Sequence, residues 1–200
     1  MNIALLQINP IVGDLDGNAA KIKEFANKAK GANLIVTSEL ALLGYPPRDL
    51  LLYPSFIKKA WVKLQKLVKE AKDLPPILVG TAVKNDNKTG RLLYNAAVLI
   101  KEGKINKIFR KSLLPTYDVF DEDRYFEPVN EPQILKINGK RIGISICEDL
   151  WNDRDFWQKP RYHFDPIEKL AREKVDFIIN LSSSPFTVEK QKLRESMISQ

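Results

Sequence analysis

The stretch RIGISICEDLW, residues 141–151, joins an expected buried strand to reactive side chains, and the rest of the chain is best interpreted from it. Isoleucines alternate with small residues as far as Ile146, which is typical of a strand with one buried face. The apolar run ends at Cys147, the only cysteine, and Glu148 and Asp149 follow directly. Because nearby negative charge disfavours a thiolate, a lone thiol in front of two carboxylates needs a chemical explanation.

Strands and helices are expected to alternate along much of the chain. Runs rich in Ile, Val and Leu predict strands, and apolar residues three and four positions apart predict amphipathic helices. The expected strands are residues 3–8, 33–38, 76–83, 93–100, 104–110, 133–138, 140–147 and 175–182. The expected helices are residues 17–31, with Gly31 as the C-terminal cap, and residues 55–72, 166–174 and 187–200.

Turn signals join the strands in the middle of the chain. NDNKTG at residues 85–90, KEGK at residues 101–104 and the pair Asn138-Gly139 are typical of tight connections between antiparallel strands. Helical crossovers near both ends, with hairpins between them, predict an α/β fold in which one mixed sheet or two sheets are flanked by helices.

The net charge of +7 raises the question of nucleic-acid binding. The lysines that cluster between Lys58 and Lys72 fall opposite an apolar face that includes Phe56, Trp61 and Leu64, so they predict a solvated helix face. No zinc-finger spacing or basic–aromatic stripe accompanies them. Nucleic acid is therefore a disfavoured partner.

The single cysteine excludes an internal disulfide and suits a reducing, cytoplasmic environment. The opening MNIALLQINP lacks the charged start of a signal peptide and is typical of a strand. No apolar run is long enough to span a bilayer, so no membrane partner is expected. His163 is the only histidine and has no second ligand at metal spacing, so no metal site is expected.

Three polar side chains lie where an apolar strand pattern ends. Glu39 follows residues 33–38, Lys111 follows residues 104–110, and Cys147 ends the run RIGISIC. Catalytic groups often lie on loops at strand ends, where a rigid sheet holds them. A thiol can attack a carbonyl carbon, a carboxylate can carry the proton, and a lysine can stabilise the developing negative charge. Together these residues predict acyl transfer.

Each signal also has an ordinary structural explanation. A lone cysteine at the end of an apolar run is often inert packing, a glutamate after a strand often starts a helix, and a lysine there is often solvated. Spacing alone does not show that the three strand ends converge. If the chain is extended at Cys147, adjacent residues point to opposite sides, so the Glu148 side chain should face away from the sulfur.

The motifs around these residues resemble the nitrilase, or carbon–nitrogen hydrolase, superfamily. SELALLGYPPRDLL contains Glu39, RKSLLPTYDVFDEDRYF contains Lys111, and IGISICEDLW contains Cys147, in the order of that superfamily. The likeness runs from ALLQINPIVGDLDGN to INLSSSPF. GYPPRDLL, YDVFDEDRYF and CEDLW are most similar to the branch formed by the N-terminal glutaminase domains of glutamine-dependent NAD synthetases.

The resemblance implies a role for each residue of the set. Glu39 would be the general base, Lys111 the transition-state stabiliser and Cys147 the nucleophile that forms a glutamyl thioester. The backbone N–H of Glu148 would join Lys111 in the oxyanion hole, and the Glu148 side chain would contact the substrate.

The resemblance also implies residues that bind glutamine. Tyr45, Tyr117, Ser182 and Ser184 would shape the pocket together with Glu148. The alternatives are that the tyrosines are ordinary half-buried aromatics and that the serines are turn residues before a proline. A role near the glutamine ammonium stays open for Asp121 or Glu122.

The implied fold is a four-layer α-β-β-α sandwich, expected to be incomplete at its C-terminus and to assemble into a homo-oligomer. Residues 1–200 would form a carbon–nitrogen hydrolase (glutaminase) domain that lacks its C-terminal part and any synthetase domain, because no GxxxxGK[ST] or SGGxDS loop is present. No cofactor is expected in this segment. ATP with magnesium would act only in the synthetase domain or subunit, which would be the partner.

The implied function is hydrolysis of the glutamine amide, which would supply ammonia for ATP-dependent synthesis of NAD from deamido-NAD. The main alternative is a stand-alone nitrilase-type amidase acting on another small amide. Two further alternatives are a domain retained for assembly only and a basic nucleic-acid-binding protein, whose binding would be sensitive to salt.

Overall fold

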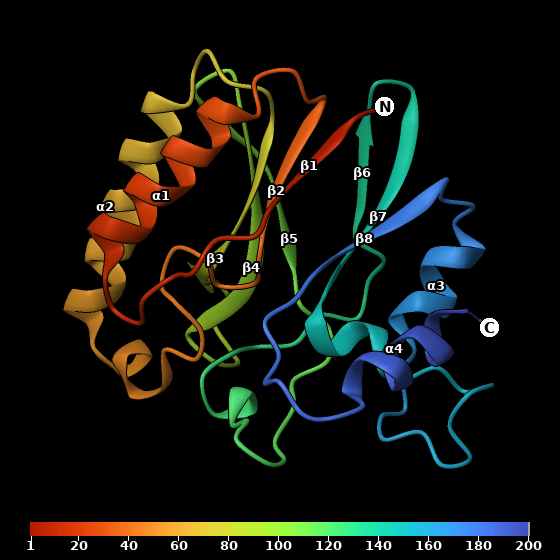
Figure 1. Cartoon of the computed structure of the whole chain (residues 1–200). Helices are drawn as coiled ribbons and strands as arrows, with labels where there is room; N and C mark the ends of the chain where they lie inside the picture. Colours follow the sequence, from red (N-terminus) through yellow and green to blue (C-terminus); the bar gives the residue numbers. More distant parts are fainter. Residues whose placement is uncertain (200) are drawn as a thin grey trace.

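The computed structural model describes residues 1–199 as two β-sheets that lie face to face between helices (Figure 1). The elements in chain order are β1 (Ile3–Leu6), α1 (Leu15–Lys28), β2 (Leu34–Thr37), η1 (Arg48–Leu52), α2 (Pro54–Glu70), β3 (Ile77–Lys84), β4 (Leu93–Lys101), β5 (Lys104–Arg110), η2 (Glu122–Arg124), β6 (Ile134–Ile137), β7 (Lys140–Ile146), η3 (Cys147–Leu150), α3 (Pro166–Arg172), β8 (Phe177–Leu181) and α4 (Lys190–Ile198). All of the expected strands and helices are therefore present, with small shifts at their ends; position 200, which the last expected helix included, lies outside the described residues.

The connections between the strands decide their directions. The larger sheet has the order β1-β2-β3-β4-β5, and the smaller sheet has the order β6-β7-β8. Strands that are joined through helices, β1 to β2, β2 to β3 and β7 to β8, run parallel. Strands that are joined by short turns, β3 to β4, β4 to β5 and β6 to β7, run antiparallel. The predicted helical crossovers and central hairpins are confirmed, and of the two alternatives left open, one mixed sheet or two sheets, the structure has two sheets.

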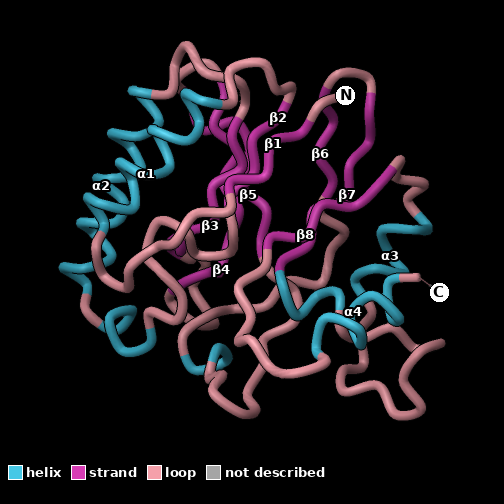
Figure 2. The backbone as a smooth tube through the Cα atoms, viewed as in Figure 1, coloured by secondary structure: helices cyan, strands magenta, loops and turns pink. Residues whose placement is uncertain are grey.

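The layers follow the order α-β-β-α. Helices α1 and α2 cover the outer face of the larger sheet, and α3 and α4 lie on the side of the smaller sheet (Figures 1 and 2). The four-layer sandwich implied by the resemblance is confirmed.

Two hydrophobic cores hold these layers together. One core lies between α1, α2 and the larger sheet and includes Ile22 and Val98. The other lies between the two sheets and includes Leu99, Phe109 and Ile144. Because side chains alternate along a strand, the neighbours Val98 and Leu99 of β4 enter different cores. The larger sheet is thus buried on both faces, which explains its nearly continuous apolar strands.

The turn between β6 and β7 has the predicted form. Asn138 and Gly139 have positive φ angles of 49° and 72°. Two consecutive residues with positive φ give the backbone twist that a two-residue hairpin requires, and asparagine followed by glycine adopts it at low cost. The two strands are consequently held in one register, with Ile137 opposite Lys140.

Two details of the helices differ from the expectation. Helix α1 ends at Lys28 with Ala29 as its cap, so Gly31 lies beyond the helix and does not cap it. Trp61 was expected on the buried face of α2, but it is 42% exposed. The reason is that Ala60 occupies the centre of the buried stripe, and the next residue lies about 100° further round the helix.

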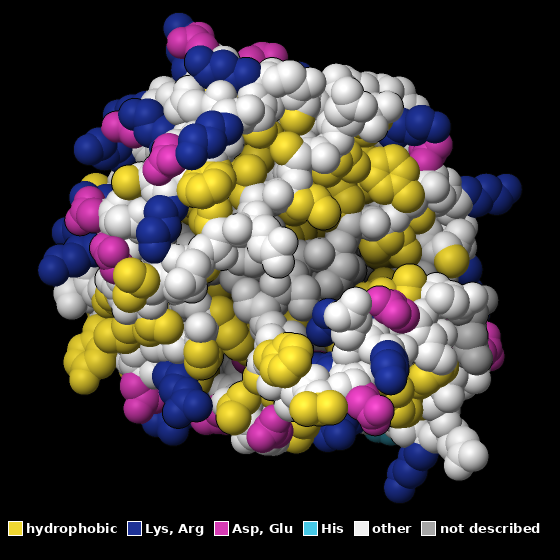
Figure 3. Space-filling view, in the orientation of Figure 1, with side chains coloured by type: hydrophobic (Ala, Val, Ile, Leu, Met, Phe, Trp, Pro, Cys, Tyr) yellow, Lys and Arg dark blue, Asp and Glu magenta, His cyan; other side chains and the backbone are white. Residues whose placement is uncertain are grey.

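The surface carries both signs of charge. On the face shown in Figure 3, lysine and arginine side chains are interspersed with aspartate and glutamate. No helix within residues 1–199 combines the length and the apolar character needed to cross a membrane.

Candidate active site

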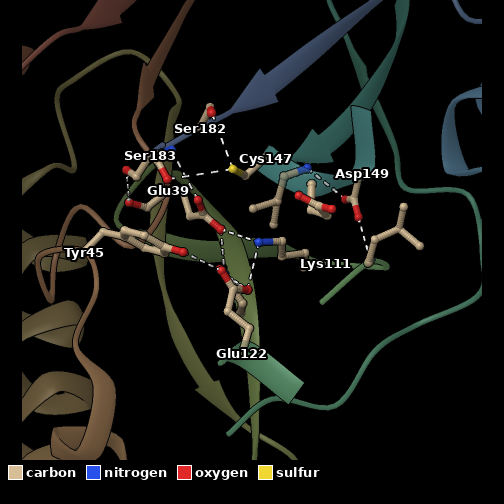
Figure 4. A network of polar contacts seen from close by, with 12 residues as sticks. Glu39, Tyr45, Lys111, Glu122, Cys147, Asp149, Ser182 and Ser183 are labelled. Carbon is tan, nitrogen blue, oxygen red and sulfur yellow. Dashed lines mark hydrogen bonds and ion pairs between the residues drawn. The ribbon is translucent and has the colours of Figure 1, made fainter. Parts of the chain in front are cut away.

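Strand ends from both sheets meet at one edge of the sandwich. In the larger sheet β5 runs in the same direction as β2, because the two antiparallel steps through β4 restore the direction of β3. In the smaller sheet β7 and β8 are parallel. Glu39, Lys111, Cys147 and Ser182 follow the ends of β2, β5, β7 and β8. Figure 4 shows that their side chains point toward one another.

Lys111 lies at the centre of a buried polar network. Its ammonium donates to Glu39 Oε1 at 2.7 Å and to Glu122 Oε2 at 2.8 Å. The amide of Asn95 donates to the same two carboxylates at 2.8 and 3.3 Å, and the Tyr45 hydroxyl donates to Glu122 Oε1 at 2.8 Å. Lys111 and Glu39 are 0% and 1% exposed, so both charges depend on each other for stabilisation.

The serines after β8 connect Glu39 to the thiol. The backbone N–H of Ser183 donates to Glu39 Oε2 at 3.2 Å, and its hydroxyl donates to the Glu39 carbonyl at 3.0 Å. The Ser182 hydroxyl lies 3.5 Å from Cys147 Sγ, and Sγ lies 3.8 Å from the Ser183 carbonyl oxygen. One oxygen of Glu39 is therefore held by Lys111, while the other faces the loop that contacts the sulfur (Figure 4).

The backbone turns sharply at both reactive segments. Cys147 has a φ angle of 45°, and Leu40, which follows Glu39, has a φ angle of 48°. Residues other than glycine rarely adopt this left-handed region of backbone conformation, because it is strained. Such strain is concentrated at functional sites. Gly80 of β3 makes the second turn possible, because a Cβ at that position would collide with the Ser38 carbonyl. The Gly80 N–H donates to Thr37 Oγ1 at 2.9 Å, and this hydrogen bond holds β3 close to the segment that carries Glu39.

Asp149 does not direct its charge at the sulfur. Its carboxylate accepts hydrogen bonds from the backbone N–H groups of Ile146 at 2.9 Å, Ser112 at 2.9 Å and Leu113 at 2.8 Å. Burial raises the pKa of Asp149 to about 6, although these three bonds oppose the increase. Asp149 thus ties the end of β7 to the segment that follows Lys111.

The expectation that Glu148 faces away from Cys147 is wrong. The chain is not extended at this point, since Cys147 begins the 3₁₀ turn η3 and the alternation of a strand stops there. The Glu148 carboxylate accepts hydrogen bonds from Tyr117 at 2.9 Å and from Tyr162 at 2.9 Å. It lines the same cavity as the sulfur.

This cavity has a volume of about 290 Å³ and combines one carboxylate with several cations. The Arg161 guanidinium lies 3.8 Å from the centre of the Tyr117 ring, and the Tyr117 hydroxyl donates to the carboxylate of Glu148. The lining residues are Tyr117, Phe120, Cys147, Glu148, Trp151, Trp157, Lys159, Arg161, Ser184 and Lys190. A zwitterionic ligand would find partners for both of its charges here.

Burial controls the protonation of the reactive groups. It raises the pKa of Glu39 to about 7, although Lys111 opposes the increase. It raises the pKa of the Cys147 thiol to about 12, and Glu39 adds to this increase while Lys111 reduces it. Burial lowers the pKa of Lys111, but Glu122 and Glu39 more than compensate and keep it well above its ordinary value. At neutral pH the site holds a thiol, an ammonium and a carboxyl group close to its midpoint.

The structure brings Glu39, Lys111 and Cys147 together, which spacing alone did not show. Of the expected pocket residues, Tyr117, Glu148 and Ser184 line the cavity of Cys147. Ser182 contacts the sulfur directly. Tyr45 instead lines a neighbouring cavity of about 490 Å³ and reaches the network through Glu122.

Some members of the network were not identified from the sequence. A role for Glu122 was left open, and its carboxylate is the second one that pairs with Lys111. Asn95 was missed, although a single asparagine inside the apolar run LYNAAVLI was a usable signal. Asp121 is an exposed residue near Arg124, at 3.9 Å. Within residues 1–199, no group of three or more His, Cys, Asp or Glu side chains is arranged to hold a metal ion.

Comparison with known proteins identifies the family of this chain. The family model described as carbon-nitrogen hydrolase matches residues 2–158. The chain belongs to this family. The recognition made from the sequence motifs is therefore confirmed.

The relatives of this carbon–nitrogen hydrolase define its branch. The glutamine-dependent NAD(+) synthetase of Synechocystis sp. is 46% identical over 205 residues, which cover 98% of this chain and 36% of the relative. The glutamine-dependent NAD+ synthetase of Acinetobacter baumannii, solved in complex with adenosine diphosphate, has a TM-score of 0.84 and 33% identity, over 99% of this chain and 35% of that one. An amidase from Nesterenkonia sp. shares the fold, with a TM-score of 0.72 and 18% identity over 96% of this chain and 68% of that one. The chain spans about a third of the length of the two synthetases.

Proposed function

We propose that this hydrolase domain cleaves the side-chain amide of glutamine through a thioester on Cys147. The observation that carries the proposal is the buried pair of Glu39 and Lys111, 2.7 Å apart, which the loop of Ser182 and Ser183 connects to the sulfur. The choice of glutamine rests on the synthetase relatives and on a small cavity that offers both a carboxylate and cations.

The first half of the reaction forms the thioester. Glu39, as the carboxylate, accepts the thiol proton while Cys147 Sγ bonds to the amide carbon. The carbonyl oxygen becomes negatively charged, and the Lys111 ammonium with the Glu148 backbone N–H stabilises it. The carbon–nitrogen bond then breaks, and the leaving nitrogen takes the proton from Glu39 and departs as ammonia.

The second half releases glutamate. Water gives a proton to Glu39 and attacks the thioester carbon, and the carbon–sulfur bond breaks as the proton returns to the sulfur. The free enzyme is restored, and the products are one glutamate and one ammonia. We assign Glu122 and Asn95 to holding Lys111 and Glu39 in place, and Tyr117, Glu148 and Ser184 to contacts with the substrate.

We further propose that residues 1–200 act as the glutaminase part of a larger enzyme. The ammonia would be consumed in the ATP- and magnesium-dependent synthesis of NAD from deamido-NAD by a synthetase domain or subunit outside this segment. The named relatives and the share of their length that this chain covers support that division. The enzyme would be a cytoplasmic homo-oligomer.

Substrate range tests this proposal against a general amidase. Release of ammonia should be measured with L-glutamine and with butyramide, which has the same reacting amide but no charged groups. We expect kcat/KM to be at least about 100-fold higher for glutamine, because loss of the partners of two buried charged contacts costs several kcal/mol. Equal kcat/KM values would favour the stand-alone amidase, and no turnover of either amide would contradict both.

A further inference from the structure

A third cavity lies between α2 and the strands of the larger sheet. Its volume is about 850 Å³, within the range of small-molecule sites. Its walls come from η1, α2, the ends of β3, β4 and β5, the loop 85–92 and the pair Arg124 and Tyr125. It shares no lining residue with the cavity of Cys147, although it adjoins the cavity of Tyr45 through Leu51, Arg124 and Tyr125. Apolar side chains form much of the wall, including Ile57, Trp61, Leu93 and Ile108.

Two of the apolar residues that line this cavity, Trp61 and Leu92, are exposed to water. Trp61 is 42% exposed and Leu92 is 77% exposed, and both line the cavity. Large apolar side chains that line an open cavity keep contact with water, so a ligand that covers them gains hydrophobic free energy. The wall therefore fits a ligand with an apolar body.

Arg110 gives the cavity its charge. This residue is half-buried at the end of β5, lines the cavity, and lies with its guanidinium 4.8 Å from the centre of the Tyr94 ring. In the part of the chain that the structure describes, its guanidinium has no hydrogen bond and no ion pair, and its Nε is buried without a partner. A guanidinium offers five donors and is normally matched by an anion.

Three of the other four lining cations are already matched, and the fourth, Lys58, is an exposed residue of α2. Arg91 pairs with Asp123 at 2.7 Å, and Lys84 pairs with Asp86 at 3.3 Å. Arg124 lies 3.6 Å from Asp49. Arg110 is thus the lining guanidinium whose charge is left for a ligand to neutralise.

We propose that this cavity binds a small organic anion with an aromatic body. The anionic group would lie on Arg110, and the ring would cover Trp61, Ile57 and Ile108. The charge complementarity of Arg110 argues for an anion, and the apolar wall argues for the ring. This inference is independent of the glutaminase proposal, because it concerns a cavity that shares no lining residue with the cavity of Cys147.

Calorimetric titration with two matched probes tests the proposal. The probes are 2-naphthoate and 2-naphthalenemethanol, which share the ring system and differ in charge. We expect 2-naphthoate to bind at least about 10-fold more tightly, because a hydrogen bond with a charged partner contributes roughly 1.5–3 kcal/mol. Equal affinity of the two probes, or no binding of either up to its solubility limit, would overturn the proposal.

Three variants locate the bound anion. Arg110→Met should reduce the affinity for 2-naphthoate to that of the neutral probe, and Arg110→Lys should keep the preference for the anion. Lys104→Met is the matched control, since it removes one exposed positive charge from the same strand outside the cavity. Unchanged binding by Arg110→Met, or an equal loss in the control, would overturn the assignment.

Measurement of the oligomeric state separates a ligand from a second copy of the chain. Light scattering should give the same mass for the wild type and for Trp61→Glu if the cavity is free for a small molecule. If the wild type self-associates and Trp61→Glu dissociates it, the cavity is covered by another protein molecule, and the proposal of a small anion is rejected.

Discussion

Cys147 lies next to two carboxylates in the sequence, yet the groups that act most on its pKa after burial come from distant segments. Glu39 raises the pKa of the thiol and Lys111 lowers it, across 108 and 36 residues of sequence. Because the thiol pKa is about 12 and the Glu39 pKa is about 7, a standing thiolate is rare. The proton must leave the sulfur as the bond to carbon forms.

Replacement of the nucleophile gives the first prediction. Cys147→Ala should abolish thioester formation and reduce glutamine turnover to background, because no other thiol exists in the chain. The fold should persist, since only a sulfur atom is removed and the expected cost is about 1 kcal/mol. Ammonia release and thermal denaturation check both parts. Retained turnover would contradict the mechanism.

Replacement of the base gives the second prediction. Glu39→Gln keeps the size of the side chain but removes the proton acceptor, so kcat should fall by about 10²–10⁴-fold. Glu102→Gln is a suitable control, because Glu102 is exposed on the turn between β4 and β5. A decrease smaller than tenfold, measured under saturating glutamine, would mean that another group carries the proton.

The pKa of Glu39 gives the third prediction. Only the ionised carboxylate accepts the thiol proton, and its pKa is about 7, so kcat/KM should rise with pH through about pH 7 and then level off. The thiol should not add a second increase below pH 9, since its pKa is about 12. A pH profile of glutamine hydrolysis tests this, and the residual rate of Glu39→Gln should lack the step near pH 7.

Local sequence patterns indicated the candidate catalytic residues more clearly than the residues that hold them in place. Glu39, Lys111 and Cys147 each end an apolar pattern, which is a local signal. Glu122 and Asn95 contribute through contacts with Lys111 and Glu39 that join segments up to 56 residues apart. A polar residue inside the apolar run LYNAAVLI marks Asn95 as unusual, but no local pattern encodes which residues it and Glu122 contact, so these pairs could be found only from the fold.

At the scale of elements, Asp149 links two of them. Its carboxylate accepts hydrogen bonds from backbone N–H groups at the end of β7 and in the segment after β5. The residue is only 2% exposed. The positions of Cys147 and Lys111 relative to each other therefore depend on one carboxylate. Its role could not be separated from that of Glu148 in advance, because the chain was expected to be extended where the turn η3 begins.

Removal of this carboxylate gives the fourth prediction. Asp149→Asn replaces one acceptor by a donor that faces a backbone N–H, so it should lower the free energy of unfolding by about 1–3 kcal/mol. It should also reduce kcat by about tenfold or more with a smaller change in KM, because the nucleophile and the ammonium lose their alignment. Asp155→Asn, at an exposed position, should change neither quantity. Lower stability with unchanged kcat would show a purely structural role.

At the scale of the whole molecule, the site belongs to both sheets. Glu39 and Lys111 follow strands of the larger sheet, whereas Cys147 and Ser182 follow strands of the smaller sheet. The core between the sheets therefore sets the distance between the base and the nucleophile. The α/β class could be predicted from the alternating patterns. The facing of the two sheets could not, because long-range packing leaves no periodic trace, and only the family resemblance supplied it.

A matched pair of core substitutions gives the fifth prediction. Ile144→Ala opens a cavity between the sheets, and Ile22→Ala opens one between α1 and the larger sheet. Both should cost about 2–5 kcal/mol, as buried isoleucines do. Only Ile144→Ala should also reduce kcat well below that of the wild type at a temperature where both variants are folded. Equal kcat values in the two variants would contradict the dependence on the intersheet core.

The hydrogen bond from Ser183 to Glu39 spans 144 positions of the chain. During translation, the segments that carry the base, the ammonium and the sulfur all leave the ribosome before the serine loop that joins them. Since domains fold as units and distant contacts form late, a nascent chain holds its reactive groups without a working assembly. Glu39, Lys111 and Cys147 therefore lack this connection until the serine loop is available to fold onto them.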